Sequence, residues 1–310
     1  MKKPNIIVLT GGAGAEREVS LKTGKAIAKT LEKTFSVKIE DLSSEKLPEN
    51  ICAEDTIVFP AIHGTFGEDG RLQTLLEEHG IVYCGSDPEA SRLCMDKLES
   101  KKVVKSAGVR VSPDISFSNP EEVEVDEVIS KLGIDLVIKP IDQGSSVALY
   151  VLRGRDELNN ILKRISPSNW MIEKRVFGRE VTVGILGDSS LGIVEVIPEG
   201  GVYDFDRKYI VGNTEYRYPA VLDCDTESEV KNFALKAFNS CGCRDFSRVD
   251  FIICEDGNAH FLEINTLPGL TETSLLPKSA SCSGYNFEKL AMTLIKPAVD
   301  RFTQNNLLTA

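Results

Sequence analysis

The stretch FSRVDFIICEDGNAHFLEINTLPG, residues 246–269, sets two carboxylates where they could hold a cation. Two apolar runs in it flank Asp256-Gly257, and an Asp-Gly pair between such runs is the strongest short-range signal for a β-hairpin. A two-residue turn at this pair places Asp250 opposite Glu263 on the neighbouring strand. Like charges that face each other across a sheet are destabilising unless a positive group lies between them. The spacing therefore predicts a bound cation.

The same register places Arg248 opposite Asn265. Side chains alternate with a period of two along a strand, so these two residues share one face with the carboxylates. The other face carries the apolar residues Val249, Phe251, Ile253, Leu262 and Ile264. Carboxylate and amide oxygens suit a hard cation such as Mg²⁺, which completes its coordination with water and nucleotide phosphates. A solvent-exposed strand face fits the pattern as well, so the hairpin alone leaves both interpretations open.

Composition is that of a soluble globular protein. The 310 residues can bury a full core, and length alone predicts about two domains. A net charge of −11 argues against a nucleic acid partner, because such binding needs a basic surface. Eight scattered cysteines indicate reduced thiols rather than a disulfide framework. The apolar run at residues 6–9 is too short for a signal sequence or a membrane span, so we expect a cytoplasmic protein without a membrane partner.

Two glycine-rich loops follow strand-like runs in the first third of the chain. Residues 5–10 lead into GGAGAE at 11–16, which lacks the third glycine of a dinucleotide fingerprint. Residues 56–61 lead into a second loop that contains HGTFGEDG at 63–70. Helical repeats follow both loops, and a further helix is expected over residues 88–105. This alternation predicts a parallel α/β sheet, with ligands at the carboxyl ends of its strands. Glu16 and His63 lie in these loops. A first-turn acid favoured by the helix dipole explains Glu16 as well as a functional role does, and a lone loop histidine such as His63 is more often structural than catalytic.

The middle of the chain offers groups that could bind phosphate. A strand over residues 136–140 carries Lys139 and leads into DQGSS, whose N–H groups and hydroxyls could cradle a phosphate without being a P-loop. Another strand ends in Glu173-Lys174. Both lysines also fit an ordinary edge strand. Residues 199–209 are predicted to form a mobile lid, and helices are expected over residues 227–240 and from about residue 287.

Eight segments, taken in order, resemble the D-alanine–D-alanine ligases of the ATP-grasp superfamily. They are GGAGAEREVS at 11–20, HGTFGEDG at 63–70, MDK at 95–97, KPIDQGSSV at 139–147, EKRVFGRE at 173–180, YDFDRKY at 203–209, RVDF at 248–251 and EINTLPG at 263–269. The resemblance covers nearly the whole chain. It implies an α/β fold of the ATP-grasp type with three lobes: a parallel α/β lobe over residues 1–95, a central lobe over 96–180 and a C-terminal lobe over 181–310. ATP would lie between the last two lobes.

The resemblance also implies roles for individual residues. Two Mg²⁺ ions, or Mn²⁺ in their place, would be held by Asp250, Glu263 and Asn265. ATP would be contacted by Lys97, Lys139, Glu173, Lys174, Val176, Glu180 and Lys208. The substrates would be contacted by Glu16, His63, Lys208, Ser274 and Leu275. The catalytic set would comprise Glu16, His63, Ser145, Tyr209, Arg248 and Gly269, of which the last two would donate hydrogen bonds to the tetrahedral oxyanion.

The implied activity is ATP-dependent ligation of two D-alanines through an acylphosphate, for peptidoglycan precursor synthesis by a homodimer. Gly14, Phe66 and Ala148 depart from the usual residues of the family, and none of these departures removes a charged group. Tyr209 favours an amine as the second nucleophile. Two alternatives remain: the same fold acting on D-lactate, D-serine or another amino acid, and an ATP-binding regulatory or scaffold protein without turnover. The full set of Arg248, Asp250, Glu263 and Asn265 counts against the second.

Overall fold

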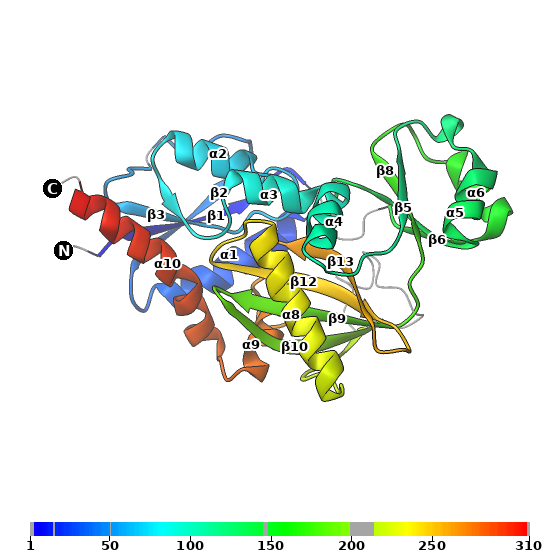
Figure 1. Ribbon diagram of the computed structural model, residues 1–310. Coiled ribbons are helices and arrows are strands. Elements are labelled where there is room, and N and C mark those ends of the chain that lie inside the picture. Colours follow the sequence, from blue (N-terminus) through cyan, green and yellow to red (C-terminus); the bar gives the residue numbers. More distant parts are fainter. Residues whose placement is uncertain (1–2, 15, 50, 145–147, 199–213, 309–310) are drawn as a thin grey trace.

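The computed structural model describes residues 3–14, 16–49, 51–144, 148–198 and 214–308 (Figure 1). Within these ranges the strands form three separate sheets, one after another along the chain. The predicted lid loop, with Lys208 and Tyr209, lies outside the described residues, and so does Ser145. The predicted lobe limits at residues 95 and 180 stay a prediction.

The first sheet is parallel, as the sequence predicts, and the structure gives its strand order as β2-β1-β3-β4. Its central strands β1 and β3 are almost entirely apolar because neither face of a parallel sheet meets water. The edge strand β2 (Ser36–Leu42) is largely exposed and was not predicted from the sequence. The other elements are β1 (Asn5–Gly11), β3 (Thr56–Pro60), β4 (Val82–Tyr83), α1 (Arg17–Leu31) and α2 (Arg71–Glu78).

The single helix predicted over residues 88–105 is wrong, because the structure divides it into α3 (Pro88–Met95) and α4 (Lys97–Ser106). Between them Asp96 has an extended backbone, and its carboxylate accepts hydrogen bonds from the N–H groups two and three residues further on. An aspartate that binds its own helix in this way is a favourable N-cap. The break starts α4 at Lys97, whose N–H donates to the carbonyl of Ile141 in the next lobe (3.0 Å).

The second sheet, with the order β5-β8-β6-β7, is antiparallel and belongs to a lobe that stands apart from the others in Figure 1. Its core consists entirely of side chains from residues 115–172, among them the one tryptophan of the chain, Trp170. The elements are β5 (Asp114–Phe117), β6 (Asp135–Pro140), β7 (Tyr150–Arg153), β8 (Trp170–Lys174), α5 (Val125–Leu132), α6 (Gly154–Leu162) and the short 3₁₀ turn η1 (Pro120–Glu122). This lobe therefore has a core of its own.

The third sheet is also antiparallel, with the order β11-β10-β9-β12-β13. Helices α8 and α9 pack on its two opposite faces, since neighbouring residues along β10 belong to different core clusters. Helix α9 was not predicted from the sequence. The elements are β9 (Arg179–Leu186), β10 (Ser189–Pro198), β11 (Thr214–Arg217), β12 (Phe246–Ile253), β13 (Ala259–Asn265), α8 (Cys224–Ser240) and α9 (Leu275–Cys282).

The last helix, α10 (Phe287–Leu308), returns to the first lobe, so that both chain ends lie on one side of the molecule (Figure 1). One core cluster joins side chains of β1, α1 and β3 to Phe246 of β12 and to the buried face of α10. In that cluster the ring of Phe246 stacks on Phe59 of β3, with the centroids 6.4 Å apart. The first and third lobes thus share a core, in contrast to the second.

All eight cysteines are free thiols, and four of them are buried, which agrees with the absence of a disulfide framework in the prediction. Among the described helices, none combines the length and the apolarity that a membrane crossing requires.

Candidate active site

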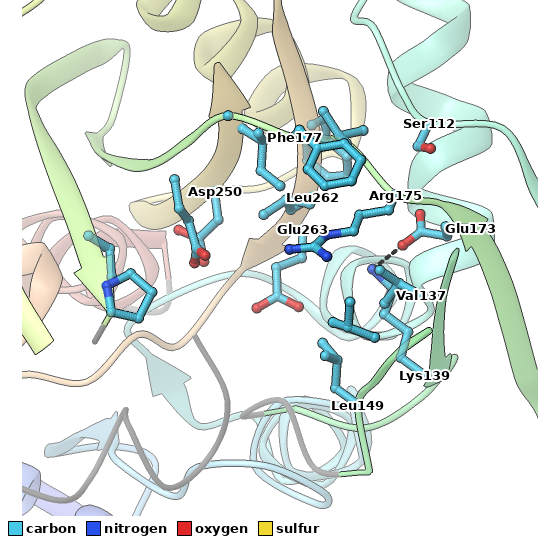
Figure 2. Close-up of a pocket in the computed structure, with 18 of the residues that line it drawn as sticks. Ser112, Val137, Lys139, Leu149, Glu173, Arg175, Phe177, Asp250, Leu262 and Glu263 are labelled. Carbon is cyan, nitrogen blue, oxygen red and sulfur yellow. Dashed lines mark ion pairs between the residues drawn. The ribbon is translucent and has the colours of Figure 1, made fainter. Parts of the chain in front are cut away.

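The register of the β12–β13 hairpin is confirmed at the residues that matter for chemistry. Asp250 lies opposite Glu263, and Arg248 lies opposite Asn265. Both carboxylates line a cleft, and Figure 2 shows them on the same side of the hairpin. The sequence pattern therefore located a pair of facing carboxylates correctly.

The predicted two-residue turn, however, is wrong. The N–H of Cys254 donates to the carbonyl of Asn258 (3.0 Å), which closes a three-residue loop with Gly257 at a left-handed φ of 80°. A β-bulge beyond Asp250 then inserts Leu262 as an extra residue and shifts the register back by one. The two shifts cancel at the carboxylates. They also place Leu262 in the wall of the cleft rather than on the core face where it was predicted (Figure 2).

The cleft lies between the second and third sheets and has a volume of about 410 Å³. This lies within the range of small-molecule sites, roughly 300–1,000 Å³. Strands β6 and β8 form one wall, β9, β10 and the hairpin form the other, and α4 contributes from one end. The predicted ATP and metal residues among its lining are Lys97, Lys139, Glu173, Lys174, Val176, Glu180, Asp250 and Glu263.

Several residues of the cleft were missed by the sequence interpretation. Val137 and Leu149 provide apolar wall, and Phe177 stacks against the guanidinium of Arg175, which lies 4.5 Å from the ring centroid (Figure 2). Apolar strand residues cannot be told from core residues by pattern alone, which explains the first two. The other two lie inside the EKRVFGRE segment and could have been found there. Apolar walls beside charged groups suit a ligand with a flat base and phosphates.

The two facing carboxylates are held in fixed orientations. Asp250 accepts a hydrogen bond from the hydroxyl of Thr182 (2.5 Å) and pairs with Arg248 (Nη2–Oδ2, 2.9 Å). Glu263 lies 3.6 Å from the ammonium of Lys97. Such outer partners are what orients the ligands of a metal site, and the oxygen donors match Mg²⁺ or Mn²⁺. The donor set therefore fits a divalent cation.

The third predicted metal ligand, Asn265, ends strand β13. Its Oδ1 accepts the N–H of Leu267 (2.9 Å), which fixes the amide at the start of the following loop. The guanidinium of Arg248, predicted as an oxyanion donor, is directed at Asp250 through both Nε and Nη2. These hydrogen bonds fix the orientations of the Asn265 and Arg248 side chains on the hairpin face.

Glu173 is buried and holds two ammonium groups at once. Its Oε1 lies 2.5 Å from Lys101, and its Oε2 lies 2.5 Å from Lys139. Burial alone would raise the pKa of Glu173, but the two lysines outweigh burial and hold that pKa below its usual value. Burial alone would lower the pKa of Lys139, but Glu173 outweighs it and the pKa is raised. Both groups are therefore charged at neutral pH, and Lys139 is no edge-strand lysine.

We expect Glu173 to make the free energy of unfolding depend on pH on the acid side. A carboxyl whose pKa is lowered by folding contributes stability above its unfolded pKa, here 4.5, and loses it as the pH falls through the lower folded value. The raised pKa of Lys139 acts only in the alkaline range. In urea titrations between about pH 7 and pH 3, the stability difference between wild type and Glu173→Gln should shrink below pH 4.5. A difference that stays constant with pH would contradict this expectation.

Three loops meet around the carboxylate of Glu16. A Cβ built on Gly64 would lie 2.6 Å from Glu16 Oε2, and one built on Gly144 would lie 3.6 Å from it. Glu16 stands before the first residue of α1 but does not cap that helix with its side chain. The glycine-rich loops after β1, β3 and β6 therefore converge on one carboxylate, and Gly64 there has a left-handed φ of 72° that favours glycine.

His63, the residue before Gly64, is buried, and both of its ring nitrogens contact polar atoms. Nε2 lies 3.0 Å from the hydroxyl of Thr23, and Nδ1 lies 3.0 Å from the carbonyl of Leu267 and 3.4 Å from Glu68. Burial raises the pKa of Glu68, and the nearby charge of Glu16 adds to this effect. Glu68 was not singled out from the sequence, although it lies within HGTFGEDG.

The remaining predicted substrate residues surround the start of α9. Ser274 occupies the N-cap position, and its Oγ accepts the N–H of Thr271 (3.1 Å). A Cβ on Gly269 would lie only 3.1 Å from that Oγ, so the loop passes close to the helix start. The side chain of Leu275 is buried in the small core beside β10, which leaves its backbone as the part able to contact a ligand. Helix N-termini favour carboxylates.

Comparison with known proteins matches both parts of the chain to described families. Residues 36–86 match "D-ala D-ala ligase N-terminus", and residues 103–296 match "D-ala D-ala ligase C-terminus". The chain belongs to the D-alanine–D-alanine ligase family. Members similar to it include the D-alanine–D-alanine ligase of Citrifermentans bemidjiense, 39% identical over 96% of this chain and 97% of the relative. The ligase of Aquifex aeolicus is 40% identical over 94% and 99%.

Solved structures of the ligase family share the fold. The D-alanine–D-alanine ligase from Bacillus anthracis, in complex with ATP, is 30% identical with a TM-score of 0.85, over 98% of this chain and all of the other (100%). The VanG D-Ala:D-Ser ligase from Enterococcus faecalis is 26% identical with the same TM-score of 0.85, over 96% and 100%. The ATP-grasp fold predicted from the sequence is thereby confirmed.

Proposed function

We propose that this chain is an ATP-dependent ligase that joins two D-alanines into D-alanyl-D-alanine for peptidoglycan synthesis. The observation that carries this proposal is the cleft in which Asp250 and Glu263 face each other. Lys97 and Lys139 line the same cleft, so that anionic and cationic groups are both available to a metal–nucleotide complex. The ligase relatives support the choice of substrate, and the net charge of −11 supports the absence of a nucleic acid partner.

The chemistry requires a carboxylate to become an electrophile. Transfer of the γ-phosphoryl group of ATP to the first D-alanine gives an acylphosphate, and the protein contributes positioning and positive charge. Lys97 and Lys139 would hold the phosphates between the second and third lobes. The apolar walls formed by Val137, Leu149 and Phe177 would hold the base.

Two divalent cations would be held by Asp250, Glu263 and Asn265 and would neutralise charge on the β- and γ-phosphates. Mg²⁺ is the expected ion and Mn²⁺ the alternative. Thr182 and Arg248 hydrogen-bond to Asp250, so protein side chains orient this ligand.

The amino acid substrates would bind where the three glycine-rich loops meet. Glu16 would hold the ammonium of the first D-alanine, with His63 beside its carboxylate, and Ser274 with the start of α9 would receive the carboxylate of the second. Arg248 and the N–H of Gly269 would donate to the oxyanion when the second amine attacks. Ser145, Lys208 and Tyr209 lie outside the described residues, and their roles stay predictions from the resemblance.

Product identification after incubation with ATP, Mg²⁺ and D-alanine tests the proposal. The expected result is D-alanyl-D-alanine together with phosphate release that requires both D-alanine and Mg²⁺. Tight ATP binding without phosphate release would instead support a regulatory protein. A cytoplasmic homodimer is also part of the proposal, and light scattering of the purified protein tests the oligomeric state.

A second candidate function keeps the fold and changes the second substrate. It is favoured by the likeness to a D-Ala:D-Ser ligase structure. Competition of D-serine and D-lactate against D-alanine, followed across pH, separates the cases. An amine substrate gains as the pH rises because it must lose a proton before attack, whereas a hydroxy acid has no ammonium to deprotonate.

A further inference from the structure

A lysine that the sequence interpretation did not single out lies buried behind the nucleotide cleft. Lys101 is 2% exposed and sits on α4, one turn after Lys97. Its ammonium contacts Asp114 (2.6 Å) as well as Glu173 (2.5 Å). A lysine is almost never fully buried without partners, so its position calls for a physical reason.

The reason lies in the register of the second sheet. Asp114 on β5 is the direct partner of Glu173 on β8, which sets two carboxylates opposite each other. Like charges in this position are destabilising, and the ammonium of Lys101 lies between them. From the cleft side, Lys139 contacts the other oxygen of Glu173 (2.5 Å), as the dashed line in Figure 2 shows. Two carboxylates and two ammonium groups thus form a charge-balanced cluster, of which only Asp114 is partly exposed.

A phosphate that binds Lys139 competes with Glu173 for the same ammonium. If Lys139 were the sole partner of Glu173, this competition would leave a buried carboxylate uncompensated, which is costly in free energy. Lys101 contacts the opposite oxygen of Glu173 and is 2% exposed, so it retains that contact while the cleft is occupied. Glu173 then keeps one ammonium partner when Lys139 turns to the ligand.

We propose that Lys101 is a positioning residue for nucleotide binding: it neutralises Glu173 from behind the cleft and thereby allows Lys139 to exchange Glu173 for a phosphate. This inference rests on the proposed function of the cleft. A purely structural role of Lys101 makes a different prediction: its loss would lower stability and change the KM for ATP and the KM for D-alanine to a similar extent.

The variant Lys101→Met tests the exchange, because methionine keeps much of the length of the side chain and removes the charge. With Lys101 gone, Glu173 should hold Lys139 more tightly, so the KM for ATP is expected to rise about tenfold or more. The KM for D-alanine should change less than about twofold, since loss of the charge acts on the ATP side. Lys105→Met, at an exposed position one turn further along α4, is the matched control and should behave as wild type. An unchanged KM for ATP in Lys101→Met overturns the inference.

The double variant Lys101→Met/Glu173→Gln separates charge compensation from packing. Once residue 173 is neutral, Lys139 no longer has a competing carboxylate, so the KM for ATP should stay within about twofold of that of Glu173→Gln alone. A tenfold difference between these two variants would assign Lys101 a role unrelated to Glu173 and would overturn the inference. This comparison also decides the matter if Lys101→Met alone does not fold. Failure of the wild type to form the dipeptide would instead refute the proposed function.

Discussion

Asp250→Asn is expected to lower kcat for dipeptide formation by about 10³-fold, which corresponds to roughly 4 kcal/mol of lost transition-state stabilisation. The side chain keeps its shape but loses the charge that faces Glu263 across the hairpin. Phosphoryl transfer depends almost entirely on positioning and on neutralised phosphate charge, so a weakened metal site acts directly on the rate. The Mg²⁺ concentration needed for half-maximal rate should rise as well. Phosphate release measured against Mg²⁺ concentration gives both numbers.

Asp256→Asn is the matched control, because it makes the same chemical change in the exposed loop of the same hairpin. Its kcat and Mg²⁺ dependence should equal those of wild type. Thr182 and Arg248 can still bind an amide oxygen at this position, but the guanidinium of Arg248 loses its charged partner, so urea denaturation of Asp250→Asn must show a folded protein at the assay temperature. If Asp250→Asn retained more than about a tenth of the wild-type kcat with an unchanged Mg²⁺ dependence, the metal assignment would be wrong.

The hairpin also illustrates how far sequence reasoning can reach. The facing of Asp250 and Glu263 follows from alternation and from a turn, and it was predicted correctly although the turn type was wrong. The three-residue loop and the bulge each shift the strand register by one residue, in opposite directions, so the register at the carboxylates is unchanged. Neither feature has a clear sequence signal, because Asp-Gly suits two-residue and three-residue loops alike and the bulged residue Leu262 is an ordinary strand residue. The face of Leu262 therefore could not be predicted.

Other parts of the site depend on contacts between segments far apart in the chain. Lys101 looks like an exposed helical lysine in the sequence, and only the structure shows that it is buried and contacts Asp114 on β5 and Glu173 on β8. The break at Asp96 has a sequence signal, since aspartate is a favoured N-cap, but the apolar residues on both sides continue the helical pattern. By contrast, the parallel strands β1 and β3 were predicted correctly because they are short, apolar and separated by a helical repeat, whereas the exposed edge strand β2 carries no such apolar run.

Phe246→Ala is expected to lower the free energy of unfolding by about 3–5 kcal/mol, the cost of removing a fully buried aromatic ring from a packed core. Phe246 contributes to the core shared by the first and third lobes, where it stacks on Phe59. The matched control is Phe177→Ala, because that ring is 55% exposed and its removal should change stability by less than about 0.5 kcal/mol. Urea denaturation followed by far-UV circular dichroism measures both variants.

The same variant reveals which lobes unfold together. Trp170, the one tryptophan, belongs to the separate core of the second lobe, so its fluorescence reports that lobe, whereas circular dichroism follows all three. Because no side chain of that separate core belongs to the cluster of Phe246, Phe246→Ala should shift the main circular dichroism transition and leave the Trp170 transition in place. An equal shift of both transitions would mean that the lobes unfold as one unit despite their separate cores. In that case the polar contacts between α4 and the second lobe, among them Lys101 with Glu173, would couple the lobes more strongly than shared apolar packing does.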